Sequence, residues 1–149
     1  MSDLRDVFEN IMALNRWSGG ESRSGPGSTL SYTCNLRSQL EIFLKTYEIK
    51  TFFDAPCGDF NWMKLLDLPI QYLGADVVED IVAENKRRFG NHSRSFTRLD
   101  LTGDTLPKVD LIFCRDCLFH FSFEHISSAL GNMKRSSPLK NCQISCLFD

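Results

Sequence analysis

Short apolar runs alternate with helical or polar stretches over the second part of the chain. The apolar runs occupy residues 51–53, 72–75, 96–99, 109–113 and 144–148. Helical periodicity follows the first, second and fourth of them, at 61–66, 78–89 and 123–133, with Ser122 as an N-cap for the last. Such alternation is typical of parallel strands joined by crossover helices. The pattern predicts an α/β fold with a Rossmann-like, doubly wound, mostly parallel sheet of about five strands.

The first part of the chain predicts N-terminal helices separated by a loop. Apolar residues recur at three- and four-residue spacing over 4–14, so we expect a helix that ends near Asn15. A second apolar face runs through 29–47, with Ser28 as its N-cap. Between the two, residues 15–28 contain four glycines, one proline and four serines, which predicts a loop without regular structure.

The length of 149 residues suits one domain with a hydrophobic core. We therefore expect a single domain over 1–149. Its N-terminal helices and Gly/Ser-rich loop occupy 1–49, and the α/β core occupies 50–149.

Charge and hydropathy exclude some classes of function. Seventeen basic against 19 acidic residues give a net charge of -2, so no strong nucleic-acid signal is present and no global field attracts an anionic membrane. Neither a stretch of about 20 apolar residues nor a signal-peptide pattern occurs. The expected compartment is intracellular, in the cytoplasm, and the six cysteines are expected to be thiols.

Two cysteine pairs have spacings that suit zinc ligands, namely Cys114 with Cys117 and Cys142 with Cys146. Cys114 ends one apolar run and Cys146 lies inside another, however, which favours packed core residues over ligands. We expect no metal site.

Acidic residues follow the predicted strands in a regular way. Asp54, Asp76 and Asp100 end the first three strands, and Arg115 and Asp116 end the fourth. In an open parallel sheet, ligands bind outside the carboxyl ends of the strands. Carboxylates converging there can accept hydrogen bonds from ribose hydroxyls or an amino group.

The spacing of these acids indicates a nucleoside ligand that lacks phosphates. Asp54 and Asp76 are one βαβ unit apart, and the second acid is where a ribose is held in such units. The turn after the first strand is not Gly-x-Gly-x-x-Gly, and Asp59 within it would repel phosphate. This argues against a dinucleotide or nucleotide-sugar enzyme and suits S-adenosylmethionine, a ribose-bearing cation.

Residues 50–120 resemble the class I S-adenosylmethionine-dependent methyltransferases. The sequence Asp54-Ala-Pro-Cys-Gly58-Asp59 is similar to their first motif, and Leu73-Gly-Ala-Asp76 to their second. The segments 96–101 and 109–116 resemble those that contact the adenine and close the pocket beside the methyl group. The resemblance implies S-adenosyl-L-methionine as cofactor, with S-adenosyl-L-homocysteine as product. The residues implied to bind it here are Asp54, Pro56, Gly58, Asp76, Asp100, Leu101 and Arg115.

The loop ahead of the first strand resembles a methyltransferase-like subfamily of unassigned substrate. In related enzymes such a segment folds over the cofactor, which implies that Trp17 and Ser28 are cofactor-binding residues of a lid. The alternative is a glycine-rich connector between two helices.

No catalytic residue can be assigned from the sequence, although Asp116 and His120 are candidates. Imidazole titrates near neutral pH, so His120 could serve as a general base. The alternatives are a half-buried loop histidine, a salt bridge between Arg115 and Asp116, and an Asx-type turn at Asp100.

A complete class I sheet has seven strands, whereas this pattern supplies about five, so we expect a sheet that is truncated on its C-terminal side. Two functions follow: methyl transfer from S-adenosylmethionine to an unidentified acceptor, or a catalytically inactive binding or regulatory module. The missing strands also imply an exposed C-terminal sheet edge, through which the chain could self-associate or bind a partner.

Overall fold

A computed structural model describes residues 4–17, 20–67, 69–136 and 143–145 of the chain. Within these ranges a five-stranded sheet forms, with strand order β3-β2-β1-β4-β5 and every neighbouring pair parallel. The strands are β1 (Thr51–Asp54), β2 (Gln71–Asp76), β3 (Arg94–Arg98), β4 (Leu111–Phe113) and β5 (Gln143–Ser145). The predicted Rossmann-like α/β sheet is confirmed.

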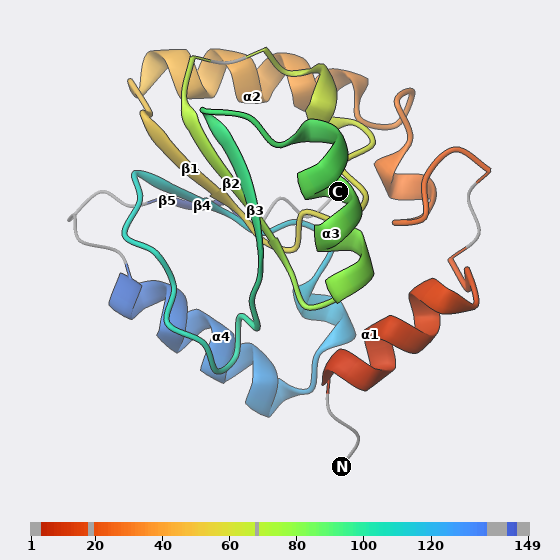
Figure 1. Cartoon of the computed structure of the whole chain (residues 1–149). Coiled ribbons are helices and arrows are strands. Elements are labelled where there is room, and N and C mark those ends of the chain that lie inside the picture. The colour runs from red at the N-terminus through yellow and green to blue at the C-terminus, as the bar shows by residue number, and fades with distance from the viewer. Residues whose placement is uncertain (1–3, 18–19, 68, 137–142, 146–149) are drawn as a thin grey trace.

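One face of the sheet is covered by α2 (Cys34–Thr46), which lies above it in Figure 1. Phe52 of β1 and Phe113 of β4 are buried in one cluster with Leu40 and Leu44 of this helix. Phe52 and Phe113 are diagonal neighbours on this face of the sheet, because the β1–β4 register places Phe52 opposite Leu111. The apolar face of α2 thus covers the central strand β1 and its neighbour β4.

The opposite face is covered by α4 (Phe123–Ser136), below the sheet in Figure 1. Phe53 and Ile112 point to this side and form a second cluster with Ala129 and Met133. Successive residues of a strand point to opposite faces, so a central strand covered on both sides is apolar throughout. Helices on both faces make the sheet doubly wound, as predicted.

One of the remaining two helices packs on the same face of the sheet as α2, and the other packs against the N-terminal end of the first. Helix α3 (Glu79–Phe89) connects β2 to β3, and Val82 joins the cluster beneath α2. Helix α1 (Leu4–Ala13) contributes Met12, which packs with Val78 and Ile81 at the start of α3. Strand order reverses between β1 and β4, which is where a ligand crevice is expected in this class of sheet.

The prediction for the second helix was wrong at its start. Residues 26–28 form a short 3-10 helix, Pro26–Ser28, and the chain is extended at Thr29. Helix α2 begins only at Cys34, with Thr33 at its N-cap, so Ser28 does not cap it. The reason is local, because the Thr29 hydroxyl donates to the carbonyl of Pro26 and the Thr33 hydroxyl to that of Thr29. These contacts favour turns over helix.

Two further predictions differ in outcome. The helix expected at 61–66 is a 3-10 turn, Met63–Leu65. The cap of α4 is confirmed, since the amide of His125 donates to the Ser122 hydroxyl over 3.2 Å.

The last predicted strand is β5, although residues 146–148 lie outside the described residues. Among the helices described, none is long and apolar enough to cross a membrane.

Substituting Phe52 by Ala tests the importance of the cluster beneath α2. Phe52 is 0% exposed, and its ring lies 5.7 Å from those of Tyr72 and Phe113. We expect Phe52→Ala to lower the free energy of unfolding in urea by about 3–5 kcal/mol, because it leaves a cavity. Ile42→Ala, at a position that is 57% exposed, is the control and should change it by about 0.5 kcal/mol or less. A loss at position 52 no larger than the control's would contradict this description of the core.

Candidate functional site

A cavity of about 100 Å³ lies at the carboxyl ends of the strands, next to the reversal of strand order. It brings together all the predicted site residues except Asp100. The predicted cofactor residues that line it are Trp17, Ser28, Asp54, Pro56, Gly58, Asp76, Leu101 and Arg115. The two catalytic candidates, Asp116 and His120, line it as well.

Asp54 ends β1 with its carboxyl group almost completely buried, at 3% exposure. The Tyr72 hydroxyl, on the adjacent strand, donates to Asp54 Oδ2 over 2.6 Å. Burial disfavours the charged carboxylate and raises the pKa of Asp54 to about 7, although the Tyr72 hydrogen bond opposes the shift. Nearby Asp76 raises this pKa further and Arg115 lowers it. The cavity wall therefore holds a carboxyl group that titrates near neutral pH.

Asp76 ends β2 and is also buried, at 6% exposure. Its Oδ1 accepts a hydrogen bond from the amide of Val78, and its Oδ2 accepts one from the amide of Gly58. Burial raises the pKa of Asp76 to about 6, against the opposing effect of these amides. A carboxylate has about four acceptor sites, so each oxygen keeps capacity for a ligand hydroxyl.

The turn after β1 depends on a glycine. Gly58 has φ 53°, in the left-handed region that favours glycine. Both of its peptide groups are bound, because its amide donates to Asp76 and its carbonyl accepts from Asn85 Nδ2 over 2.8 Å. A side chain at this position would lie 2.2 Å from Ser24 Oγ, so the turn also allows another segment to approach closely.

That segment comprises residues 20–30, which we call the lid segment. Asp59 holds it: the Ser22 hydroxyl donates to both carboxylate oxygens at 3.0 and 2.9 Å, and the amide of Arg23 donates over 2.8 Å. The amide of Asp59 in turn donates to Ser24 Oγ over 3.0 Å, and that hydroxyl lies 3.3 Å from Asp59 Oδ1. We call this set of bonds the Asp59 latch.

A second carboxylate, that of the exposed Glu21, also binds the lid segment. Glu21 Oε1 accepts from the amide of Leu30 over 2.6 Å and from Asn61 Nδ2 over 2.8 Å. The Asn61 amide also donates to the carbonyl of Ser28 over 3.0 Å. Ser28, predicted to lie in a lid, thus takes part through its backbone, and the lid segment is joined to the turn after β1 at several points.

Aromatic rings close the cavity on the side of α1. The ring of Trp17 stacks on that of His120, with centroids 5.1 Å apart and planes inclined by 26°. Phe8 of α1 meets both rings edge to face, at 6.1 and 6.2 Å. Partial burial lowers the pKa of His120, and the nearby Asp116 carboxylate opposes this shift. The neutral imidazole, which can accept a proton, is therefore favoured at neutral pH.

Arg115 and Asp116 form an ion pair at the end of β4. Arg115 Nη1 lies 2.7 Å from Asp116 Oδ2, and the side chain of Arg115 is only 6% exposed, whereas that of Asp116 is 41% exposed. The Arg115 guanidinium also lies over the ring of Tyr32, 5.9 Å from its centroid. Asp116 has φ 52°, and the lid residue Gly27 lies beside its carboxylate. The pair predicted as an alternative is present, and it lines the cavity at the same time.

The third strand-end acid is placed differently. Asp100 Oδ1 accepts from the amide and the hydroxyl of Thr102, at 2.8 and 2.7 Å. This is the Asx-type turn expected as the alternative, and Asp100 does not line the cavity. Its neighbour Leu101 does line it and is buried, with its carbonyl bound to Asn132 Nδ2.

Metal ligands do not come together within the described part of the chain, where no group of three or more His, Cys, Asp or Glu side chains is close enough to hold an ion. Cys114 is buried at 2% exposure in the cluster under α4, as predicted. Cys142 and Cys146 lie outside the described residues.

Several residues that shape the site were not predicted from the sequence. Tyr72, Asn61 and Asn85 are buried or bind buried partners, and none of them follows a strand. A polar side chain on the buried face of α3 was an available signal for Asn85, because a buried amide needs hydrogen-bond partners. Nothing in the local pattern signals that Asp59 binds residues 22–24, which lie 35 to 37 positions away.

Comparison with known proteins gives matches in structure but none in sequence. No protein-family model matches the sequence. No curated protein matches it either.

Solved structures of methyltransferases match the fold. The N-methyltransferase NodS from Bradyrhizobium japonicum WM9, in complex with S-adenosyl-l-homocysteine, superposes with a TM-score of 0.68 at 16% identity over 87% of this chain and 68% of its own. Magnesium protoporphyrin IX methyltransferase (ChlM) from Synechocystis PCC 6803 with bound SAH gives 0.64 at 18% identity, over 91% of this chain and 67% of its own.

The matches also include a protein named for a different reaction. The [4+2]-cyclase SpnF superposes with a TM-score of 0.62 at 16% identity, over 90% of this chain and 55% of its own. This chain thus spans between about half and two thirds of the length of the solved structures named above. This chain therefore shares its fold with the solved structures of these methyltransferases.

Proposed function

We propose that the chain binds S-adenosylmethionine in the strand-end cavity and transfers its methyl group to an acceptor. The observation that carries the proposal is the convergence of the predicted cofactor residues on one cavity, with Asp54 and Asp76 buried in its wall. The cofactor would supply an activated methyl group, so the contribution of the protein is mainly to bind and align the reactants.

The chemistry of the wall fits a ligand with a ribose and a positive charge. Both Asp76 oxygens keep acceptor capacity beside the Gly58 amide, which suits the two hydroxyls of a ribose. Asp54 and Asp76 lose hydration in the closed cavity, and a nearby cation would stabilise their charged forms. A phosphate would meet these carboxylates and Asp59 at close range.

The fit requires the lid segment to move. The cavity holds about 100 Å³, whereas pockets for ligands of drug size hold about 300–1,000 Å³. Ser24 and Ser28 of the lid segment line the cavity, so displacing this segment enlarges the space directly. The structure is therefore a closed form, and binding begins with its opening.

Asp116 and His120 are the residues we propose for the acceptor side. Both line the cavity and both are partly exposed, so an acceptor can reach them from solvent. The neutral imidazole of His120 could take a proton from an attacking amine or hydroxyl, and the carboxylate of Asp116 would stabilise the resulting charge. The acceptor itself is unidentified.

Isothermal titration with S-adenosylmethionine and S-adenosylhomocysteine tests the binding proposal. We expect saturable heat with dissociation constants on the order of micromolar, in the range of ordinary small-molecule sites. Transfer of a labelled methyl group into cell extract then tests the reaction. The absence of heat at near-millimolar ligand would overturn the proposal. Binding without any transfer would instead favour the catalytically inactive module.

Comparing Asp76→Ala with Asp100→Ala separates the two strand-end acids. Asp76→Ala should weaken binding of S-adenosylhomocysteine by about tenfold or more, since hydrogen bonds to charged groups contribute about 1.5–3 kcal/mol. Asp100→Ala should change affinity by less than about threefold, because Asp100 does not line the cavity. The exposed Asp67→Ala is the control. Equal effects at positions 76 and 100, in variants with unchanged melting temperature, would contradict the assignment.

The affinity should also depend on pH. The pKa values of Asp54 and Asp76 are raised to about 7 and about 6, so both groups are increasingly protonated and neutral below these values. A cationic ligand binds the charged forms better, so affinity should rise by about tenfold between about pH 5.5 and 7.5 and protons should be released on binding. Titrations in buffers of different ionisation enthalpy measure that release.

The variant Asp54→Asn provides the control for this pH dependence. Asparagine keeps an oxygen that can accept from the Tyr72 hydroxyl, but it does not titrate. Its affinity should vary less with pH than that of the wild type. A wild-type affinity that stays constant over this range would show that neither carboxylate changes its charge on binding.

A further inference from the structure

We propose that Asp59 is a positioning residue that holds the lid segment closed, and that a groove beside α3 is the entrance through which the cofactor reaches the cavity. The proposal rests on the proposed function, since it concerns how the same ligand enters and leaves. It assigns a role to Asp59 that is separate from contact with the ligand.

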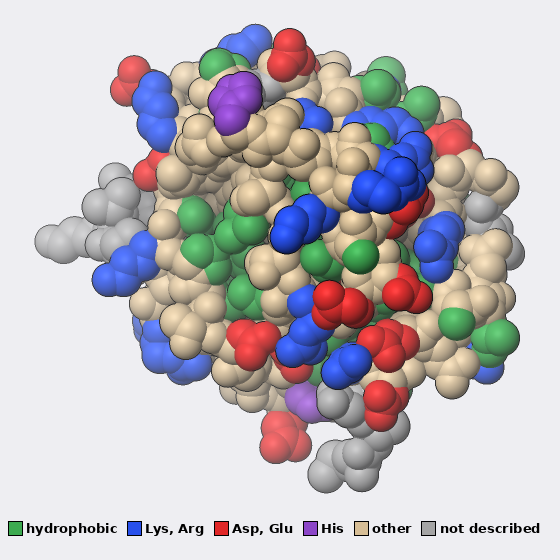
Figure 2. All heavy atoms as spheres, viewed as in Figure 1, with side chains coloured by type: hydrophobic (Ala, Val, Ile, Leu, Met, Phe, Trp, Pro, Cys, Tyr) green, Lys and Arg blue, Asp and Glu red, His purple; other side chains and the backbone are tan. Residues whose placement is uncertain are grey.

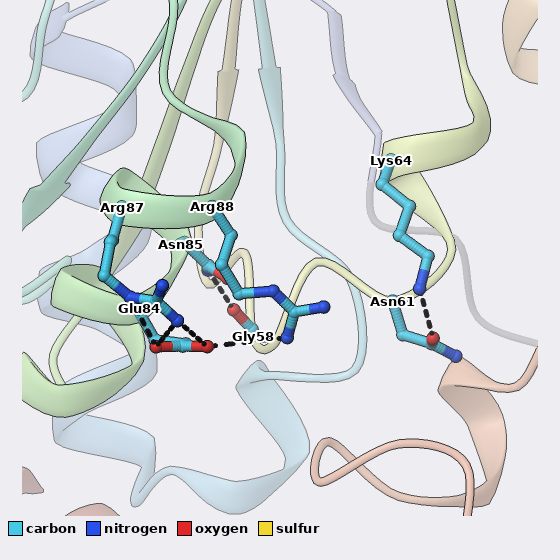
Figure 3. Close-up of polar contacts among 7 residues, drawn as sticks. All are labelled: Gly58, Asn61, Lys64, Glu84, Asn85, Arg87 and Arg88. Atoms are coloured by element: carbon cyan, nitrogen blue, oxygen red, sulfur yellow. Dashed lines mark hydrogen bonds and ion pairs between the residues drawn. The ribbon is translucent and has the colours of Figure 1, made fainter.

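The groove, which we call the α3 groove, holds about 840 Å³. Its walls are the lid residues 20–23 on one side and the helix residues 80–89 on another, with Asn61 and Lys64 on the turn between. Figure 3 shows the side chains of α3 on one side of the Gly58 turn and the Asn61–Lys64 pair on the other. The groove is therefore large enough for a ligand that the closed cavity cannot admit.

The Asp59 latch separates this groove from the cavity. Asp59 and Asn61 line both spaces, while Ser22 and Arg23 line the groove and Ser24 lines the cavity. The partition between them thus consists of the bonds from residues 22–24 to Asp59 and from Asn61 to the lid segment. Breaking these bonds joins the two spaces without unfolding any helix or strand.

The charges of the groove suit a zwitterionic ligand. Arg87 and Arg88 converge on Glu84, at 2.9 and 3.5 Å, and on the other side of the turn Lys64 donates to Asn61 (Figure 3). Lys, Arg, Asp and Glu side chains are intermingled over this face of the molecule in Figure 2. An amino-acid moiety that carries both an ammonium and a carboxylate finds a partner for each at this entrance.

The latch acts on rates more than on affinity if it closes the lid in both the free and the bound protein. Weakening it then raises the population of the open form in both states. Association and dissociation rate constants should rise together, and their ratio should change little. A residue that contacts the ligand directly would behave differently, because its loss mainly raises the dissociation rate constant.

Stopped-flow measurement of S-adenosylhomocysteine binding tests this, with tryptophan fluorescence as the signal. Trp17 and Trp62, the two tryptophans of the chain, both line the cavity. Asp59→Asn keeps the size of the side chain but removes the charge that three donors of residues 22–24 and the Asn61 amide share. We expect both rate constants to rise by about tenfold, with the dissociation constant changed by less than about threefold.

Two further variants complete the test. Ser22→Ala removes the hydroxyl that binds both Asp59 oxygens and should raise both rate constants in the same direction, so the test does not depend on one variant. Asp67→Asn is the matched control, because Asp67 is exposed and lines neither space. Hydrogen exchange without ligand provides a second readout: the Arg23 and Asp59 amides should exchange faster in Asp59→Asn.

The outcomes separate this inference from the proposed function. If the wild type binds S-adenosylhomocysteine but Asp59→Asn leaves both rate constants unchanged, the latch proposal is wrong and the binding proposal stands. If the affinity falls while association stays constant, Asp59 contacts the ligand and the latch proposal is again wrong. If the wild type does not bind, both proposals fail, whatever the exchange rates show.

Discussion

The burial of two carboxyl groups at the ends of β1 and β2 is the constraint on which the rest of the site depends. The parallel register sets Asp54 beside Gly74, two residues before Asp76, so both acids lie in one water-poor corner. Buried carboxyl groups need hydrogen-bond donors, and the chain supplies the Tyr72 hydroxyl to one and two backbone amides to the other. One of these amides belongs to Gly58. The conformation of the turn after β1 therefore follows from the need to satisfy Asp76.

The turn after β1 also determines how the N-terminal part of the chain packs. The absence of a side chain at Gly58 lets Ser24 approach, and the next residue, Asp59, collects donors from residues 22–24. The ring of Trp17 stacks on that of His120. The lid segment also contains the short 3-10 helix, and α2 begins only after it. Segments that are remote in sequence are joined through hydrogen bonds and ring contacts, which break individually at low cost. A lid held in this way can open while the sheet and its two apolar layers stay intact.

The sequence predicts the elements whose signals are periodic or local, and it misses those that depend on remote partners. Strands β1 and β4 were recognisable because a strand buried on both faces is a continuous apolar run. Asp54 and Asp76 could be placed at the site because strand ends meet at one edge of a parallel sheet. Asp100 also ends a predicted strand, so it was predicted to lie at the site. Its carboxylate instead accepts a hydrogen bond from Thr102, two residues later, within a local turn. The role of Asp59 could not be predicted, because its partners precede it by 35 to 37 residues.

Fold alone does not decide the reaction, since the same architecture is shared by methyltransferases and by a [4+2]-cyclase. The two buried acids bear on which ligand suits the cavity, because burying their charged forms is unfavourable. Burial removes water from Asp54 and Asp76, and this desolvation is the largest cause of their raised pKa values. An uncharged nucleoside leaves both acids partly protonated, whereas an ammonium or sulfonium restores their charged forms and gains attraction in a low-dielectric site. For the function proposed above, this balance favours a cationic ligand over a neutral one, because the positive charge of the ligand offsets the burial of these acids.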